Sequence, residues 1–185
     1  MSTHSKHPDK ERFHFVTFTC FRWLHLFEET KIYDYLTFWF KKLRESGYLL
    51  NGYVIMPNHM HLIVYPSKES KDMNKAFGEA KRFLAYEIVK RLKSAGKDRL
   101  LDILTAGVQH NERIKGKRHQ VFRLSFDAKK LEGDAVERVL DYIHHNLVSG
   151  IWNLVDDFTD YPYSSAGYYD CEKQSYYTIV YFREV

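Results

Sequence analysis

The segment YVIMPNHMHLIVY, Tyr53 to Tyr65, carries the pattern that decides the fold. Two runs rich in β-branched, aromatic and other apolar residues, Tyr48 to Met56 and His59 to Tyr65, are separated only by Pro57 and Asn58. Runs of this composition favour strands, and so short a break favours a tight antiparallel hairpin. We therefore expect the two runs to pair directly.

The sequence around this hairpin predicts a strand and a helix before it and a helix and a strand after it. A strand is expected over Phe13 to Cys20 (FHFVTFTC). The apolar residues from Ile32 to Leu43 follow the i, i+3, i+4, i+7 spacing of an amphipathic helix, which Gly47 ends. A second helix is expected over Asp72 to Ser94, and HQVFRLSF, His119 to Phe126, has the composition of a strand.

A third helix is expected to open at Asp134, with Glu137 three residues on in a capping-box-like arrangement. The order is then strand, helix, strand, strand, helix, strand and an extra helix. This order predicts an α+β, ferredoxin-like (split βαβ) fold, in which an antiparallel sheet has helices on one face plus an extra C-terminal helix. We expect one domain over residues 1–185, with a core over about 12–150 and no regular structure in the aromatic tail, 151–185.

The composition excludes several classes of protein. No apolar run approaches the roughly 18 residues that a membrane helix needs, and Met1 to Lys10 lacks the apolar stretch of a signal peptide. We therefore expect a cytoplasmic protein that does not act in a membrane. Cys20 and Cys171 are too few for a disulfide scaffold and form no CxxC pair, so both are expected to be packing residues.

The net charge of +4 is unevenly distributed along the chain. Residues 68–130 hold 17 of the 28 Lys and Arg residues but 8 of the 24 Asp and Glu residues, which gives this stretch a local charge of +9. A basic middle favours an electropositive face for a polyanion, of which nucleic acid is the commonest. The alternative is a set of solvated helix faces.

Two histidines of the hairpin form a candidate metal site. Because side chains alternate along a strand, His59 and His61 project from one face while Met60, Leu62 and Val64 face the core. Two imidazoles about 7 Å apart along one strand face can share a metal ion. The alternative is a pair of surface histidines at the start of a strand.

One tyrosine stands out as a candidate nucleophile. Of the 14 tyrosines, Tyr142 alone lies in a convincing helix with a good oxygen ligand, Asn146, one turn on. Residues at i and i+4 lie one above the other, so a nucleophile and a ligand at this spacing can address one metal-bound substrate. The alternative is an ordinary, half-buried helix tyrosine.

These motifs resemble the HUH (His-hydrophobic-His) superfamily of single-stranded DNA nucleases. MPNHMHLIVY resembles its signature, and YIHHN, Tyr142 to Asn146, resembles the Tyr-Ile-x-x-Asn/Gln helix of its single-tyrosine transposases. FHFVTFTC and DYPYSSA are similar to the REP-associated tyrosine transposase branch, and the resemblance covers about residues 12 to 170. One departure is Asn146-Leu147, where the family often has Asn-Pro. It alters the helix exit but leaves the nucleophile and ligand positions intact.

The resemblance implies that His59, His61 and Asn146 hold a divalent metal, Mg²⁺ or Mn²⁺, and that Tyr142 is the nucleophile on the extra C-terminal helix. A phenol with an ordinary pKa of about 10 is a poor nucleophile at neutral pH, and a divalent ion assists by polarising the scissile phosphate. Attack by Tyr142 would leave a 5′-phosphotyrosine link and a free 3′-hydroxyl. Because that link conserves the phosphodiester's energy, the hydroxyl of another strand can reverse the step without ATP.

The resemblance also implies partners for the chain: single-stranded or hairpin DNA and a second copy in a homodimer, with no nucleotide cofactor. His144 and His145, inside the helix motif, are candidate contacts to DNA or to the metal ligands. The densest basic patch runs from Lys115 to His119. The residues expected to contact DNA are Lys75, Lys81, Arg82, Lys90, Arg113, Lys115, Lys117, Arg118 and His119.

Two other functions stay open. The first is a catalytically silent module on the same fold that binds hairpin DNA or RNA with a strong salt dependence. The intact set of His59, His61, Tyr142 and Asn146 argues against it. The second is a small metal-dependent hydrolase of a different phosphodiester, which would leave no protein-linked product.

Overall fold

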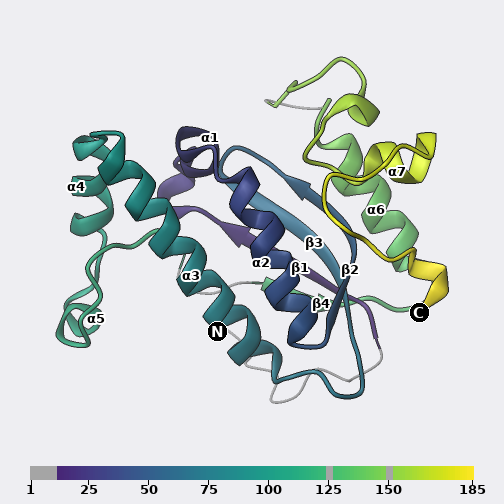
Figure 1. Cartoon of the computed structure of the whole chain (residues 1–185), viewed down its shortest axis with the longest axis horizontal. Helices are drawn as coiled ribbons and strands as arrows, with labels where there is room; N and C mark the ends of the chain where they lie inside the picture. Colours follow the sequence, from purple (N-terminus) through teal and green to yellow (C-terminus); the bar gives the residue numbers. More distant parts are fainter. Residues whose placement is uncertain (1–11, 124–126, 149–151) are drawn as a thin grey trace.

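A four-stranded antiparallel sheet forms the centre of the computed structural model, which describes residues 12–123, 127–148 and 152–185 (Figure 1). The strands are β1 (His14–Thr19), β2 (Tyr48–Ile55), β3 (His59–Pro66) and β4 (Asp127–Lys130), in the order β2-β3-β1-β4. The hairpin partner β3 therefore lies between β1 and β2, as a split βαβ unit requires. This confirms the α+β, ferredoxin-like expectation.

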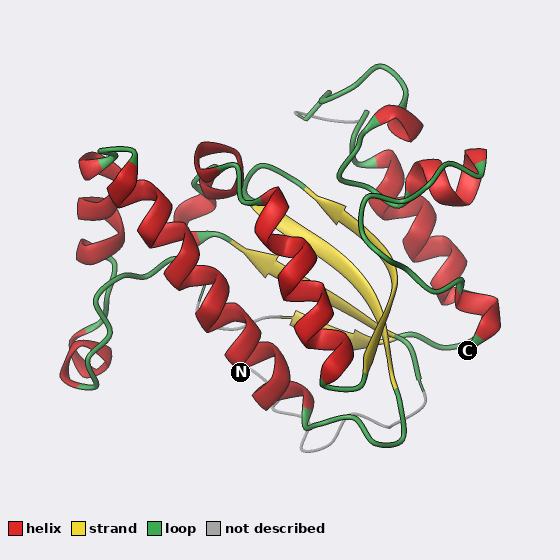
Figure 2. Cartoon of the chain, in the orientation of Figure 1, coloured by secondary structure: helices red, strands yellow, loops and turns green. Residues whose placement is uncertain are grey.

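Two long helices, α2 (Tyr33–Glu45) and α3 (Met73–Ser94), cover one face of the sheet (Figure 2). They bury Trp39, Phe77 and other apolar side chains against Leu62 and its neighbours, in the larger of two hydrophobic clusters. After α2 the chain turns at Gly47, where φ is +87° and an added Cβ would lie 2.6 Å from the Ser70 Cα. Only glycine fits this turn without strain.

The opposite face of the sheet is covered by α6 (Ala135–His145). Its residues Leu140 and Ile143 pack against Ile63 of β3 in the second hydrophobic cluster. The helix approaches the sheet closely at Gly52, where an added Cβ would lie 2.5 Å from the Leu140 Cδ2. The extra C-terminal helix thus lies against the sheet face opposite α2 and α3.

The aromatic tail, for which no regular structure was expected, covers the outer edge of β2. Backbone N–H groups of Ile55 and Val180 donate to the carbonyls of Tyr163 and Leu50, each at 2.9 Å. Covering an edge strand in this way removes a template for pairing with another chain. The tail's regular elements are the short helices η2 (Phe158–Asp160), α7 (Ala166–Cys171) and η3 (Phe182–Glu184).

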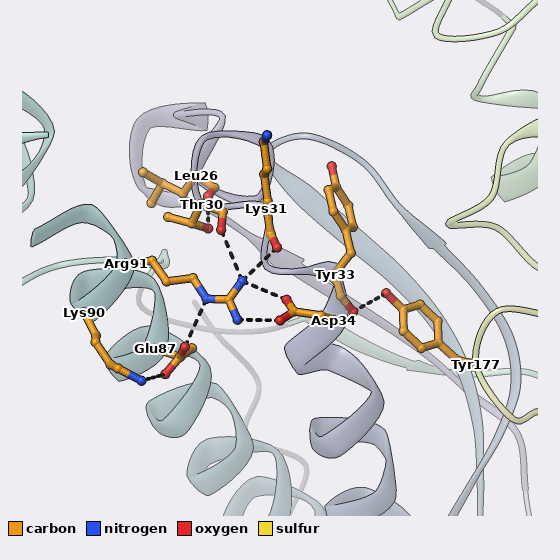
Figure 3. A network of polar contacts seen from close by, with 9 residues as sticks. All are labelled: Leu26, Thr30, Lys31, Tyr33, Asp34, Glu87, Lys90, Arg91 and Tyr177. Carbon is orange, nitrogen blue, oxygen red and sulfur yellow. Dashed lines mark hydrogen bonds and ion pairs between the residues drawn. The ribbon is translucent and has the colours of Figure 1, made fainter. Parts of the chain in front are cut away.

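A polar clamp joins α3 to α1 (Leu26–Thr30) and to the start of α2 (Figure 3). The Arg91 guanidinium donates to both carboxylate oxygens of Asp34 at 2.7 and 2.9 Å, and to Glu87 at 3.0 Å. It also donates to the carbonyls of Thr30 and Lys31, at the C-terminal end of α1. Pairing with Asp34 and Glu87 raises the pKa of Arg91 further. One cation therefore fixes three elements together.

The fourth strand lies later in the chain than predicted. The strand expected over 119–126 does not form in its described part, where Phe122 makes one isolated bridge to Cys20 and Gln120 is buried; residues 124–126 lie outside the described part of the chain. The pairing strand is the exposed segment β4, which takes its geometry from the open edge of β1. The apolar residues Val121 and Phe122 are buried without forming a strand.

Three smaller expectations also need correction. Asp134 does not cap α6 with its side chain but pairs with Arg138, while Glu137 binds Arg183 at 2.5 Å, so no capping box forms. Cys171 is exposed, so only Cys20 is a packing residue. Two short helices after Gly96, α4 (Asp98–Ala106) and α5 (His110–Ile114), were not predicted.

Within the described residues, no helix is both long enough and apolar enough to span a membrane.

Candidate functional site

The histidine pair of β3 lies buried beneath α6. His59 and His61 are 5% and 8% exposed, and their ring centroids are 4.8 Å apart. The rings thus converge to less than the about 7 Å spacing of alternate residues on a strand. This burial contradicts the alternative of two surface histidines, whereas Met60, Leu62 and Val64 face the larger cluster as expected.

Hydrogen bonds orient both imidazoles. The Asn58 Nδ2 donates to the Trp23 carbonyl at 3.0 Å, so the Asn58 Oδ1 faces His59 and accepts from its Nδ1–H at 2.7 Å. The His61 Nδ1 is hydrogen-bonded to the Thr17 Oγ1 at 2.9 Å. Engaging Nδ1 leaves Nε2 of each ring for another partner, and this is how proteins orient metal-binding histidines.

Burial also sets the charge of this pair. Desolvation lowers the pKa of His59 to about 4. Desolvation and the neighbouring His59 together lower the pKa of His61 to about 3. Both rings are therefore neutral at pH 7, which is the form that binds a metal ion.

Helix α6 brings Tyr142 to the same place. The centroids of the Tyr142 and His61 rings are 6.1 Å apart, although the two residues are far apart in the sequence. Tyr142 is 55% exposed, whereas Leu140 and Ile143 of the same helix are buried in the second cluster. Its ring is therefore open to a substrate from solvent while it borders the histidine pair.

Asn146 lies at the C-terminal end of α6, one turn beyond Tyr142, and its backbone N–H donates to the Tyr142 carbonyl at 3.2 Å. Its side chain makes no hydrogen bond to the described residues. Two neutral Nε2 atoms and one amide oxygen are a donor set that suits a divalent ion with open positions for phosphate oxygens. Among the described residues, no group of three or more His, Cys, Asp or Glu could hold a metal, and the three proposed ligands are all neutral side chains.

Aromatic rings that the sequence did not single out surround the pair. Trp23, at the end of η1 (Phe21–Trp23), and Trp152 each lie with ring centroids 5.6 Å from His59. Phe15 of β1 stacks on His61 at 5.2 Å. Phe15 lies in a strand that the sequence predicted, whereas the two tryptophans lie outside the predicted strands and helices, so no periodicity pointed to them.

The two histidines inside the helix motif have different surroundings. His144 is buried, its Nε2 is hydrogen-bonded to the Ser165 Oγ at 2.9 Å, and burial lowers its pKa to about 4. It thus joins α6 to the C-terminal segment. His145 is exposed and lies 3.1 Å from the Asp141 carboxylate.

A basic groove of about 830 Å³ lies between α3 and residues 112–123. It collects six of the nine residues expected to contact DNA, together with Lys93 and Arg123, which the sequence reasoning missed. Glu112 is the one acidic side chain among the described residues that line it. The six predicted residues are Lys81, Arg82, Lys115, Lys117, Arg118 and His119.

The other three predicted contacts lie outside this groove. The Arg113 guanidinium donates to the carbonyls of Thr105 and Val108, and the Lys90 Nζ lies 3.2 Å from the Glu87 carboxylate. Lys75 stands at the start of α3, where its backbone N–H is capped by the Asp72 side chain. The sequence alone does not distinguish basic residues that line a groove from those that bind carbonyls or carboxylates of the protein itself.

The backbone of one groove residue, Arg123, is joined to the end of β1. The Arg123 N–H donates to the Thr19 carbonyl at 2.9 Å, and Thr19 pairs with His59 across the sheet. Within the groove, the Lys81 Nζ donates to the Arg123 carbonyl at 2.7 Å. Burial, and then the charge of Lys117, lower the pKa of Lys81 to about 8. The segment that lines the groove is therefore connected through the end of β1 to the strand that carries His59.

Comparison with solved structures finds a similar fold in a transposase. A REP-associated tyrosine transposase bound to a REP hairpin aligns with a TM-score of 0.56 and 20% identity over 89% of this chain and 82% of its own. A protein assigned as a transposase of Deinococcus radiodurans R1 aligns with a TM-score of 0.37 and 15% identity, over 78% and 97% of the two chains. No protein-family model matches the sequence, and no curated protein matches it either. The chain thus shares the fold of the REP-associated tyrosine transposase.

Proposed function

We propose that the protein is a metal-dependent enzyme that nicks and joins single-stranded, hairpin-forming DNA through a 5′-phosphotyrosine intermediate, as a transposase does. The observation that carries this proposal is the meeting of Tyr142 with His59 and His61. An open tyrosine ring borders two buried, neutral imidazoles whose Nδ1 atoms are already engaged. A structural role alone requires neither the exposure of the tyrosine nor the burial of the histidine pair.

The reaction follows from these side chains. His59, His61 and Asn146 would hold Mg²⁺ or Mn²⁺, which supplies charge neutralisation at the scissile phosphate. The Tyr142 Oη attacks phosphorus, a bond to the 5′-phosphate forms, and the bond to the 3′-oxygen breaks. The phenolic proton passes to solvent, to which Tyr142 is open, and the 3′-oxygen takes a proton from water. Reversal by another 3′-hydroxyl frees Tyr142 and joins the strands.

The basic groove supports DNA as the substrate. Its cations would neutralise backbone phosphates of a bound strand. The structural neighbour is bound to a REP hairpin, which favours a hairpin for this fold. With no carboxylate of its own among the proposed ligands, the site would depend on the DNA phosphate to complete the metal's coordination.

The test is a search for the covalent link. The protein is incubated with a pool of single-stranded hairpin oligonucleotides and Mn²⁺, and denaturation-resistant adducts are mapped by mass spectrometry. We expect one adduct, at Tyr142, which EDTA prevents. Tyr142→Phe should lose the adduct and keep DNA binding, whereas Tyr176→Phe, an equally conservative change at an exposed tyrosine that does not line the groove, should keep both.

The other outcomes point to the competing functions. An adduct that persists in Tyr142→Phe would contradict the assignment of the nucleophile. Salt-sensitive binding without any adduct would identify a catalytically silent module. Cleavage without a protein-linked product would identify a hydrolase.

A further inference from the structure

Trp23 is an exposed aromatic ring that borders the histidine pair. It is 52% exposed, and its ring lies edge-on to His59 at 5.6 Å between centroids. Among the described residues, the exposed large aromatic rings are those of Trp23, Phe38, Phe83, Tyr86, Tyr142 and Tyr176. Of these, Trp23 and Tyr142 are the two with ring contacts to the histidine pair. Tyr142 is assigned to the reaction, and Trp23 has no role in it yet.

The backbone that presents Trp23 is strained. Arg22 and Trp23 have φ values of +51° and +58°, in the left-handed region that non-glycine residues rarely adopt. Hydrogen bonds hold this conformation: the Trp23 N–H donates to the Cys20 carbonyl, and the Trp23 carbonyl accepts from Asn58. Strain of this kind clusters at functional sites, where surrounding contacts maintain it. Here it turns a large apolar ring toward solvent beside His59.

A cation without an ion pair in the described part of the chain directly precedes Trp23 in the sequence. The Arg22 side chain is exposed, its guanidinium lies 5.3 Å from the centre of the Phe21 ring, and it makes no ion pair with the described residues. Proteins bind single-stranded nucleic acid with exposed aromatic rings and nearby cations, because a base stacks on the ring while the cation contacts the backbone.

We propose that Arg22 and Trp23 form a nucleotide-binding subsite, in which an unpaired base of DNA next to the scissile phosphate stacks on the Trp23 indole and Arg22 contacts the adjoining phosphate. The subsite rests on the proposed function, since it positions the single strand that Tyr142 attacks. Because every base has a stacking face, the subsite fixes the register of the strand without requiring one base.

The probe is a DNA hairpin with a single-stranded oligo(dT) flank, bound in the presence of EDTA so that no cleavage occurs. Abasic positions are introduced one at a time along the flank. We expect one abasic position to weaken binding to the wild-type protein on the order of tenfold. The same position should cost Trp23→Ala almost nothing, because the stacking partner is already gone, while Trp23→Phe should keep most of the penalty. Phe38→Ala, which removes a comparably exposed ring on α2, should behave as the wild type.

Two further readouts separate this subsite from a structural role. DNA should quench tryptophan fluorescence in the wild type and much less in Trp23→Phe, since Trp39 is buried with its Nε1 donating to the Ala80 carbonyl. Trp152→Phe serves as the control for the third tryptophan, which also borders His59. Arg22→Gln should lower the slope of log affinity against log salt by about one.

The outcomes distinguish this inference from the proposed function. Equal abasic penalties in the wild type and Trp23→Ala, with the Tyr142 adduct intact, would overturn the subsite alone. A penalty specific to Trp23 without any adduct would support the subsite and overturn the chemistry. Absence of hairpin binding by the wild type would overturn both. Thermal unfolding of each variant shows that it is folded, and a Trp23→Ala change in self-association without a change in DNA binding would assign Trp23 to an interface.

Discussion

The two faces of β3 differ in chemistry although both are buried. On one face Met60, Leu62 and Val64 pack among the aromatic residues under α2 and α3. On the other, His59 and His61 are nearly as buried but hold hydrogen-bonded, neutral imidazoles under α6. The first face gains stability from apolar burial. The second gives up that gain and requires a polar partner for each Nδ1 atom. A strand that buries two imidazoles on one face is organised for a ligand.

The largest expected effect is on the apolar face. Leu62→Ala should reduce the free energy of unfolding by about 2–5 kcal/mol, since it leaves a cavity in a fully buried position. Urea denaturation measures this loss, and metal binding per folded molecule should be unchanged. The volume-conserving Met60→Leu is the control, with an expected loss below about 1.5 kcal/mol. A metal affinity that falls with Leu62→Ala in the folded protein would mean that the two faces are not separable.

The reverse pattern is expected on the imidazole face. Thr17→Val keeps the shape of the side chain but removes the hydroxyl group that is hydrogen-bonded to the His61 Nδ1. Metal affinity should fall about 10- to 100-fold, the usual effect of losing an orienting partner. Titration of Mn²⁺ in the presence of uncleavable DNA measures it. Thr37→Val, the same change at an exposed position of α2, should leave the affinity unchanged. An unchanged affinity in Thr17→Val would show that the hydroxyl does not orient the ring.

A smaller loss of stability is expected at the polar clamp around Arg91, which lies outside the apolar cluster under α2 and α3. Arg91→Lys removes the two-pronged pairing with Asp34 and the bonds to the carbonyls at the end of α1, and should cost about 1–2 kcal/mol of stability. Asp34→Asn should cost less, about 0.5 kcal/mol, because that carboxylate is largely exposed. Chemical denaturation distinguishes them. A loss of adduct formation by folded Arg91→Lys would extend the site to the clamp.

The smallest effect is a dependence on pH in the groove. Because burial lowers the pKa of Lys81 to about 8, its charge is present at pH 7 and is lost as the pH rises. DNA affinity should therefore fall a few-fold between about pH 7 and about pH 9, and Lys81→Met should flatten that fall. The folded state favours the neutral amine, so this group's contribution to stability rises with pH from about 8 toward the ordinary lysine value of about 10.5. Lys75→Met, outside the groove, should retain the wild-type pH dependence.

Much of the fold could be predicted because its elements are periodic. The hairpin around Pro57 and Asn58 and the helices α2 and α3 carry apolar residues at strand or helix spacing, and the structure places them as expected. The strand β4 could not be predicted, because its four exposed residues obtain their geometry from the edge of β1 and not from their own composition. Local preference is weak where tertiary pairing decides.

The candidate site divides in the same way. The spacing of His59 and His61 and the position of Tyr142 on a helix could be read from local patterns, and the structure places these residues together. Trp23 and Asn58 escaped notice because their roles depend on loop conformation and on a hydrogen bond between distant segments. The buried state of His144 depends on Ser165, a contact that no spacing encodes.

Gly52, in β2, affects the position of Tyr142 on α6. Leu140 rests where a side chain at position 52 would be, and Tyr142 follows two residues later on the same rigid helix. The separation between the tyrosine and the histidines is thus set by a missing methyl group on a different strand. A residue outside the proposed reaction would then determine how close Tyr142 lies to the histidines. Substituting it offers a way to retune the reach of Tyr142 while every reactive side chain stays the same.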